Sequence, residues 1–122
     1  NFGSVVVIDN SAQYDITVNT DGSYSHGAGF IEITPPQEGI YDIGNILPAG
    51  TAVTSVTVTQ DAPLSAGVYN FQVVNLTETH TNPSDGSGVV RVWVGGTARS
   101  SGTTAPYPDN VYTGTITIQV NF

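Results

Sequence analysis

Cysteine, methionine and lysine are all absent from this chain of 122 residues. Without cysteine, the chain has neither disulfide bonds nor thiolate metal ligands. Without methionine it has no initiator residue, so we expect a processed product from which a signal peptide has been removed. No apolar run is long enough to span a bilayer, and we therefore expect no membrane insertion.

Positively charged residues are also scarce. Arg91 and Arg99 are opposed by ten acidic residues, and the net charge is -8. Binding to a polyphosphate backbone requires clustered cations, so nucleic acid is a poor partner for this chain. Charged residues form 10% of the sequence, whereas soluble domains have roughly 25%. Threonine, serine, asparagine and glutamine supply the polar faces instead, and such a surface favours an extracellular location.

Apolar and polar residues alternate at period two in many short stretches, and no stretch has a sustained helical pattern. Ser4–Ile8 differs, because its continuous apolar run is typical of a strand covered on both faces. We expect strands in Ser4–Ile8, Tyr14–Asn19, Gly29–Thr34, Ile40–Ile46, Val53–Thr59, Val68–Val74, Val89–Val94 and Thr113–Phe122.

Turn-forming residues separate these stretches, for example "TPPQEG" from Thr34, "DAPLSAG" from Asp61 and "NPSDGSG" from Asn82. Roughly seven to nine short strands at this spacing predict an all-β sandwich with Greek-key connections. The length fits one domain over residues 1–122, and no linker is visible.

Catalytic patterns are hard to find. His26 and His80 lie in polar contexts that indicate solvated loops, and no Gly-x-Ser-x-Gly motif is present. Two acid pairs, Glu32 with Glu38 and Asp9 with Asp15, are of the type that catalyses glycosyl transfer. Single acids that alternate with apolar residues more often lie on the solvent-exposed face of a strand. We therefore expect no enzyme and no cofactor, and a hydrolase using loop carboxylates ranks last among the hypotheses.

Two further patterns leave alternatives open. Asp85 and Asp109 lie in flexible turns rich in carbonyl groups, where calcium finds oxygen ligands, but the density of acids is too low to assign a metal site. Asn75-Leu76-Thr77 is an Asn-x-Thr acceptor near the end of an expected strand.

Trp93 falls on the opposite side of its expected strand from Val90, Val92 and Val94. An exposed tryptophan beside Arg91 suits either a subunit contact or stacking on a sugar ring. Tyr107, in a proline-flanked loop, is a second candidate for such a contact. The alternative is that both faces of the sheet are covered at this point.

The last stretch raises a question about assembly. It places Ile116, Ile118, Val120 and Phe122 on one side, with polar residues on the other. An unpaired strand edge can pair with a strand from another chain. When one subunit donates a strand to the next, the contact does not close into a ring, so repeated contacts produce a filament. We expect strand-exchange or groove positions at Val5, Val7, Ile116, Ile118, Val120 and Phe122.

Three motifs carry a resemblance to a known group of proteins. "NFGSVVV" at the start, "VGGTA" at Val94–Ala98 and "YTGTITIQVNF" at the end resemble a bacterial secreted all-β domain family of unknown function. That family is similar to spore coat protein U and to chaperone–usher fimbrial subunits. The sequence departs from the closing motif before Tyr112, where "PDNV" stands in place of its first glycine.

This resemblance implies an immunoglobulin-like, pilin-like sandwich at the bacterial cell surface. In fimbrial relatives an extension ahead of the domain is the donor strand, and here the chain begins on the Phe2-Gly3 motif. Three possibilities remain open: the extension was trimmed, the Ser4–Ile8 run takes its role, or the subunit uses another contact.

The combined expectation is a structural subunit of a bacterial extracellular filament. Its partners are identical subunits, with a periplasmic chaperone and an outer-membrane usher as further candidates. The alternative function is a secreted carbohydrate-binding or adhesin domain that uses Trp93 and Tyr107.

Overall fold

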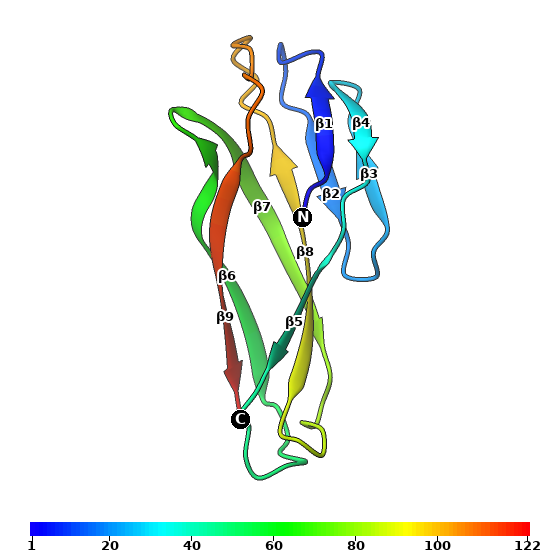
Figure 1. Ribbon diagram of the computed structural model, residues 1–122, viewed down its shortest axis with the longest axis vertical. Helices are drawn as coiled ribbons and strands as arrows, with labels where there is room; N and C mark the ends of the chain where they lie inside the picture. Colours follow the sequence, from blue (N-terminus) through cyan, green and yellow to red (C-terminus); the bar gives the residue numbers. More distant parts are fainter.

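The computed structural model describes all 122 residues, which form nine β-strands and no helix (Figure 1). The number of strands agrees with the seven to nine expected from the alternating pattern. No helix of the length and hydrophobicity needed to cross a bilayer is present. In chain order, the strands are β1 (Ser4–Val7), β2 (Asp15–Val18), β3 (Tyr24–His26), β4 (Phe30–Thr34), β5 (Gly39–Ile43), β6 (Ser55–Ala66), β7 (Tyr69–His80), β8 (Val90–Arg99) and β9 (Thr113–Asn121).

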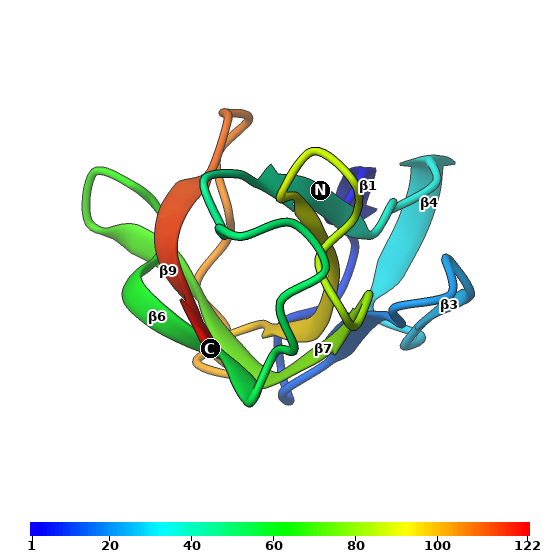
Figure 2. The same ribbon diagram turned by 90° about the horizontal axis from the view of Figure 1, so that it is seen from below.

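The strands form two sheets that pack together, and every strand pair is antiparallel. The smaller sheet contains β1 and β4. The larger has the order β3-β2-β8-β7-β6-β9, with β5 paired to β8 beyond the end of β2. Seen along the long axis, β6 and β9 lie across the interior from β5 and the start of β8 (Figure 2). The fold is therefore all-β and sandwich-like.

The larger sheet divides because β6 and β7 pair over only a short distance. Their ladder joins Leu64–Ala66 to Tyr69–Phe71, next to the hairpin turn. Beyond this ladder, β6 pairs with β9, while β7 pairs with β8. The divergence creates two layers with an apolar interior between them.

Two clusters of buried side chains fill this interior. The first lies in the half of the molecule that holds the C-terminus and includes Val56 of β6 with Val90 and Val92 of β8. The second lies in the other half and includes Ile16, Phe30, Phe71 and Ala98. The alternating residues Ile116, Ile118 and Val120 of β9 pack against the first cluster. This confirms that they share the inward face of the last strand.

The glycine pair of the "VGGTA" motif lies where three strands approach closely. β7 is irregular opposite it, since the register shifts between Val74 and Thr77 and Asn75 has a φ of 53°. A Cβ atom on Gly95 would lie 2.5 Å from the carbonyl oxygen of Val18 in β2. Any side chain at Gly95 would therefore separate β2 from β8.

Three sequence-based expectations are wrong or only partly right. The turn expected at "DAPLSAG" begins only at Gly67, the last residue of the segment, and β6 continues to Ala66, because register shifts on both sides of Ala62 accommodate Pro63 without ending the strand. Both histidines lie in strands, His26 in β3 and His80 at the end of β7. The Ser4–Ile8 run is not covered on both faces: Val6 is 45% exposed and Ile8 is 57% exposed.

The last residue departs from the pattern of β9. Phe122 lies beyond the end of the strand and is 61% exposed, whereas Ile116, Ile118 and Val120 are partly buried. The alternating pattern identifies the inward face of a strand, but a side chain past the last paired residue has no opposing layer against which to pack.

Candidate functional site

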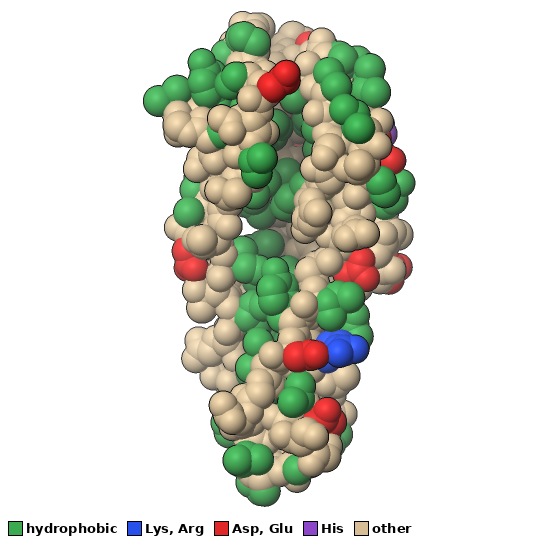
Figure 3. Space-filling model, viewed as in Figure 1, with side chains coloured by type: hydrophobic (Ala, Val, Ile, Leu, Met, Phe, Trp, Pro, Cys, Tyr) green, Lys and Arg blue, Asp and Glu red, His purple; other side chains and the backbone are tan.

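A groove opens on one side of the molecule, in the half that lies away from the C-terminus. Figure 3 shows it as a hollow in which apolar side chains are visible. Its volume is about 690 Å³, and 18 of the 30 residues that line it are hydrophobic. Asp109 is the only acidic or basic side chain among them. This depression, mainly apolar with one carboxylate, is the main concave feature of the fold.

The groove lies between the first strand and the last. Val5 and Val7 of β1 line one wall, and Gly114, Thr115 and Ile116 of β9 line the other. The larger sheet supplies the floor, which includes Leu64 of β6, Phe71 and Val73 of β7 and Val94 of β8. Figure 1 shows β1 and β9 on opposite sides of this space, pointing in opposite directions.

Both walls present a strand edge without a partner. β1 pairs only with β4, and β9 pairs only with β6. No backbone hydrogen bond joins β1 to β9. Antiparallel strands direct alternate amide and carbonyl groups to each side. The edges of β1 and β9 that face the groove therefore offer unpaired donors and acceptors above an apolar floor.

Three aromatic rings close one end of the groove. Tyr107 stacks on Phe71 with 4.2 Å between ring centroids and 14° between planes. Tyr112 meets Phe71 edge-on at 5.1 Å, and desolvation raises the pKa of its phenol. The Tyr107 hydroxyl donates to the Asn70 carbonyl at 2.8 Å and accepts from the Ser101 amide at 2.9 Å. Tyr107 thus ties the loop before β9 to β7.

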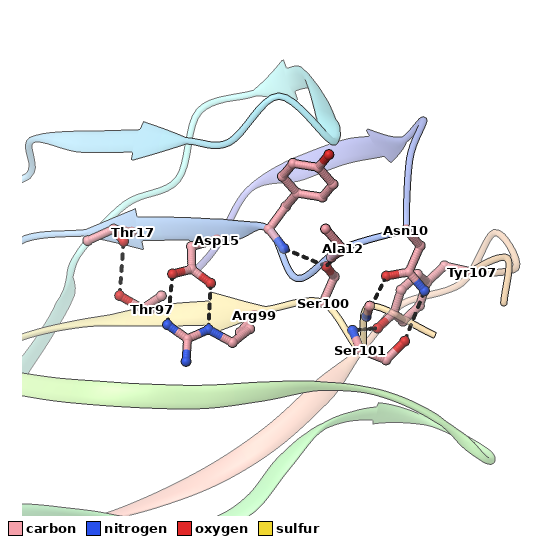
Figure 4. Close-up of polar contacts among 11 residues, drawn as sticks. Asn10, Ala12, Asp15, Thr17, Thr97, Arg99, Ser100, Ser101 and Tyr107 are labelled. Atoms are coloured by element: carbon pink, nitrogen blue, oxygen red, sulfur yellow. Dashed lines mark hydrogen bonds and ion pairs between the residues drawn. The ribbon is translucent and has the colours of Figure 1, made fainter. Parts of the chain in front are cut away.

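A buried asparagine also holds this loop (Figure 4). Asn10 is 7% exposed, and its Nδ2 donates to the Ser101 hydroxyl at 2.9 Å and to the Ala105 carbonyl at 2.8 Å. Its Oδ1 accepts from the Gly102 amide at 2.9 Å. With all these hydrogen bonds formed, a short polar side chain positions the loop at low energetic cost.

The Phe2-Gly3 motif secures the β1 wall. Phe2 lines the groove and packs against the second cluster. Gly3 has a φ of 78°, and a Cβ atom there would collide with the Thr34 carbonyl. The amide of Gln37 donates to the Asn1 carbonyl at 2.7 Å. Glycine is needed at this turn so that the chain can pass close to β4 and place Phe2 inside.

The structure brings together some of the six predicted strand-exchange residues. Val5, Val7 and Ile116 line the groove. Ile118 and Val120 do not, because they lie further along β9 and pack into the first cluster. Phe122 lies at the opposite end of the molecule from the groove.

The two predicted contact aromatics lie in separate places. Tyr107 belongs to the aromatic end of the groove. Trp93 lies in β8 between Ile40 of β5 and Thr79 of β7, on the face opposite Val92 and Val94. Trp93 therefore lies on the outer side of the strand, as expected from the alternation along Val89–Val94. Its side chain is half-buried by these neighbours.

Both arginines are paired to an aspartate directly across a strand pair. Arg99 of β8 binds Asp15 of β2 at 2.8 and 3.0 Å, and Arg91 binds Asp42 of β5 at 2.7 and 2.9 Å. These hydrogen bonds lower the pKa of both aspartates. The chain therefore offers no unpaired arginine to an anionic ligand.

No three side chains of the types that bind metals lie together. The Asp85 carboxylate accepts from the amides of Ser87 and Val89, at 2.8 and 3.0 Å, and so stabilises its own turn. Asp109 lies at the groove. His80 contacts Glu78 at 2.8 Å.

No family model, curated protein or solved structure matches this chain. The resemblance to spore coat and fimbrial subunits thus rests on short sequence motifs alone.

Sequence reasoning missed several groove residues, chiefly Leu64, Phe71, Val73 and Tyr112. A signal for Tyr112 was present, since "APYPDNVY" places two tyrosines in a loop rich in proline. The floor residues carry no such signal, because an inward-facing valine or phenylalanine has the same pattern under a groove as under a closed core.

Proposed function

We propose that this chain is a structural subunit of a bacterial extracellular filament whose neighbouring subunits assemble by strand exchange. The observation that carries the proposal is the apolar groove between the unpaired edges of β1 and β9. A strand from a neighbouring subunit would occupy it.

Physical complementarity supports this occupant. A strand laid between β1 and β9 can hydrogen-bond to both edges, while its alternate side chains enter the apolar floor. A small, compact ligand would satisfy the floor but leave the strand edges unpaired. A donor segment that lies outside the groove makes the contact heterologous, and a heterologous contact that does not close propagates into a filament.

An immunoglobulin-like, Greek-key topology of the pilin type would account for a sandwich with an open position between its first and last strands. Under this proposal the protein is displayed at the bacterial cell surface, and a periplasmic chaperone and an outer-membrane usher deliver it. Its partners in the filament are identical subunits, and it has no enzymatic activity.

The absence of cysteine allows a sharp test of the groove. Thr115→Cys and Gln119→Cys each introduce one thiol on the exposed side of β9, and only Thr115 lines the groove. Each variant is purified, folded and then labelled with a bulky maleimide, so that the label cannot affect folding. Electron microscopy and resistance to denaturant report assembly.

We expect the label at Thr115→Cys to abolish filaments and the label at Gln119→Cys to leave them unchanged. Equal filament yields from both labelled proteins would contradict the proposal, as would a wild-type protein that stays monomeric at high concentration.

A further inference from the structure

A second depression lies where β6 and β7 diverge below their hairpin. Its volume is about 570 Å³, and Ala62 and Pro63 are its only apolar side chains. It exists because β6 changes register on both sides of Ala62 and turns toward β9, while β7 stays with β8. We name this depression the polar cleft.

Carboxamides dominate the lining of the polar cleft. Three of the five glutamines in the chain lie there, together with one asparagine: Gln13, Gln60, Gln72 and Asn70. Each carboxamide offers both a donor and an acceptor. A surface of this kind recognises a ligand that also presents both, at several neighbouring positions.

Two charged groups with restrained geometry flank the carboxamides. Arg99 is held by its two hydrogen bonds to Asp15 (Figure 4), which leaves three of its five N–H groups free. The Asp61 carboxylate accepts from the Thr117 hydroxyl at 2.6 Å through Oδ2, and no hydrogen bond occupies its Oδ1. The cleft therefore combines a positioned donor with a positioned acceptor.

The chemistry of the polar cleft excludes most ligand classes. Anions are disfavoured because Asp15 neutralises Arg99 and Asp61 adds negative charge. An apolar ligand would find little apolar surface. No three potential metal ligands lie together. A neutral ligand with several hydroxyl or amide groups remains.

We propose that the polar cleft binds a neutral saccharide, with Asp61 accepting from sugar hydroxyls, Arg99 donating to them, and the carboxamides doing both. The cleft lacks an aromatic ring on which a sugar could stack. Binding is therefore weak, with a dissociation constant of about 1 mM. The site is separate from Trp93 and does not require strand exchange, although Gln60 and Ala62 line both the polar cleft and the groove.

The test is a nuclear magnetic resonance titration of the isotope-labelled protein with maltotriose, cellotriose and diacetylchitobiose in turn. We expect at least one of them to give saturable shifts in the side-chain amide signals of Gln13, Gln60, Gln72 and Asn70 and in the Arg99 Nε signal. Gln72→Ala and Asp61→Asn should each weaken binding about fivefold to tenfold, since the first removes a hydrogen-bonding side chain and the second replaces a charged acceptor with a neutral amide.

Gln119→Ala is the matched control, because Gln119 is an exposed glutamine outside the cleft. It should bind like the wild type. The spectrum of each variant also reports whether the fold is retained. Absence of saturable shifts with all three saccharides would overturn the proposal. So would shifts confined to the surroundings of Trp93, or unchanged affinity in both cleft variants.

Discussion

The ring of Tyr107 lies nearly parallel to the ring of Phe71, at a centroid distance of 4.2 Å. Through this contact, a residue of the loop before β9 covers a residue of β7 at the end of the groove. The loop therefore depends on both the ring and the hydroxyl of Tyr107, and the two contributions can be measured separately.

Tyr107→Phe removes the hydroxyl that bonds to Asn70 and Ser101 but keeps the stacked ring. We expect a loss of about 1 kcal/mol in the free energy of unfolding, typical of lost hydrogen bonds at a partly exposed site. Tyr107→Ala also removes the ring, so its loss should reach about 3 kcal/mol. Urea denaturation measures both. Equal losses in the two variants would show that the stacking contributes nothing.

Gly95→Ala tests the close approach of β2 to β8. The new methyl group would lie 2.5 Å from the Val18 carbonyl oxygen, so the two strands must separate. We expect a loss of about 1–3 kcal/mol in the free energy of unfolding, as for other overpacked sites. In Gly96→Ala the nearest atom, at 3.1 Å, belongs to the flexible Leu76 side chain, so the loss should be smaller.

Gly86→Ala is the control for this pair, since nothing lies within 4 Å of its Cβ position. Chemical denaturation should rank the three variants with Gly95→Ala least stable and Gly86→Ala most stable. The reverse order for Gly95 and Gly96 would contradict the packing described for the "VGGTA" motif.

The ion pair between Asp15 and Arg99 makes the free energy of unfolding weakly dependent on pH in the acidic range. Hydrogen bonding to Arg99 is the main cause of the lowered pKa of Asp15 in the folded protein. Because the pKa of Asp15 is lower in the folded than in the unfolded protein, the ion pair contributes its full stabilisation above the unfolded-state pKa of about 3.9. It is lost as the pH falls through the folded pKa.

The effect should be modest, because both side chains are partly exposed and solvent screens the pair. Asp15→Asn should lower the free energy of unfolding at neutral pH and leave it almost unchanged near pH 2. Thermal denaturation as a function of pH measures the difference between the two proteins. A difference that persists undiminished at pH 2 would exclude the ion pair as its source.

Much of the fold could be predicted from the sequence, for a physical reason. In β9 one face packs on the core and the other faces water, so period-two alternation records the burial of Ile116, Ile118 and Val120 directly. The strand β4 was predictable in position within Gly29–Thr34, but its inward face was not, since Phe30 is buried while Ile31 and Ile33 are exposed. Local patterns succeed where burial alternates with the chain.

The errors arise where tertiary contacts outweigh local signals. "DAPLSAG" contains turn-forming residues, yet β6 continues as far as Ala66 because β7 and β9 pair with its last residues, and only Gly67 belongs to the turn. The groove could not be located from the sequence, since the placement of β1 opposite β9 depends on the topology of the whole chain. The alternation of Ile116 and Ile118 also could not show that only Ile116 reaches the groove.

Ile118→Asp tests the inward face of β9. Ile118 is partly buried against the first core cluster and does not line the groove, so the aspartate would place an unpaired charge against apolar side chains. We expect a cost of about 3–5 kcal/mol and loss of the folded state, as seen by circular dichroism. Gln119→Asp, on the exposed face of the same strand, should fold normally. Filaments in wild-type yield from Ile118→Asp would show that the face assignment of β9 is wrong.

Electron cryomicroscopy of the assembled protein tests strand exchange most directly. The account predicts density for one additional extended segment between β1 and β9, with backbone bonds to at least one of these edges and side chains entering over Val73 and Leu64. That segment should be traceable to the neighbouring subunit. Filaments in which the groove is empty, or in which each subunit's own chain fills it, would contradict the account.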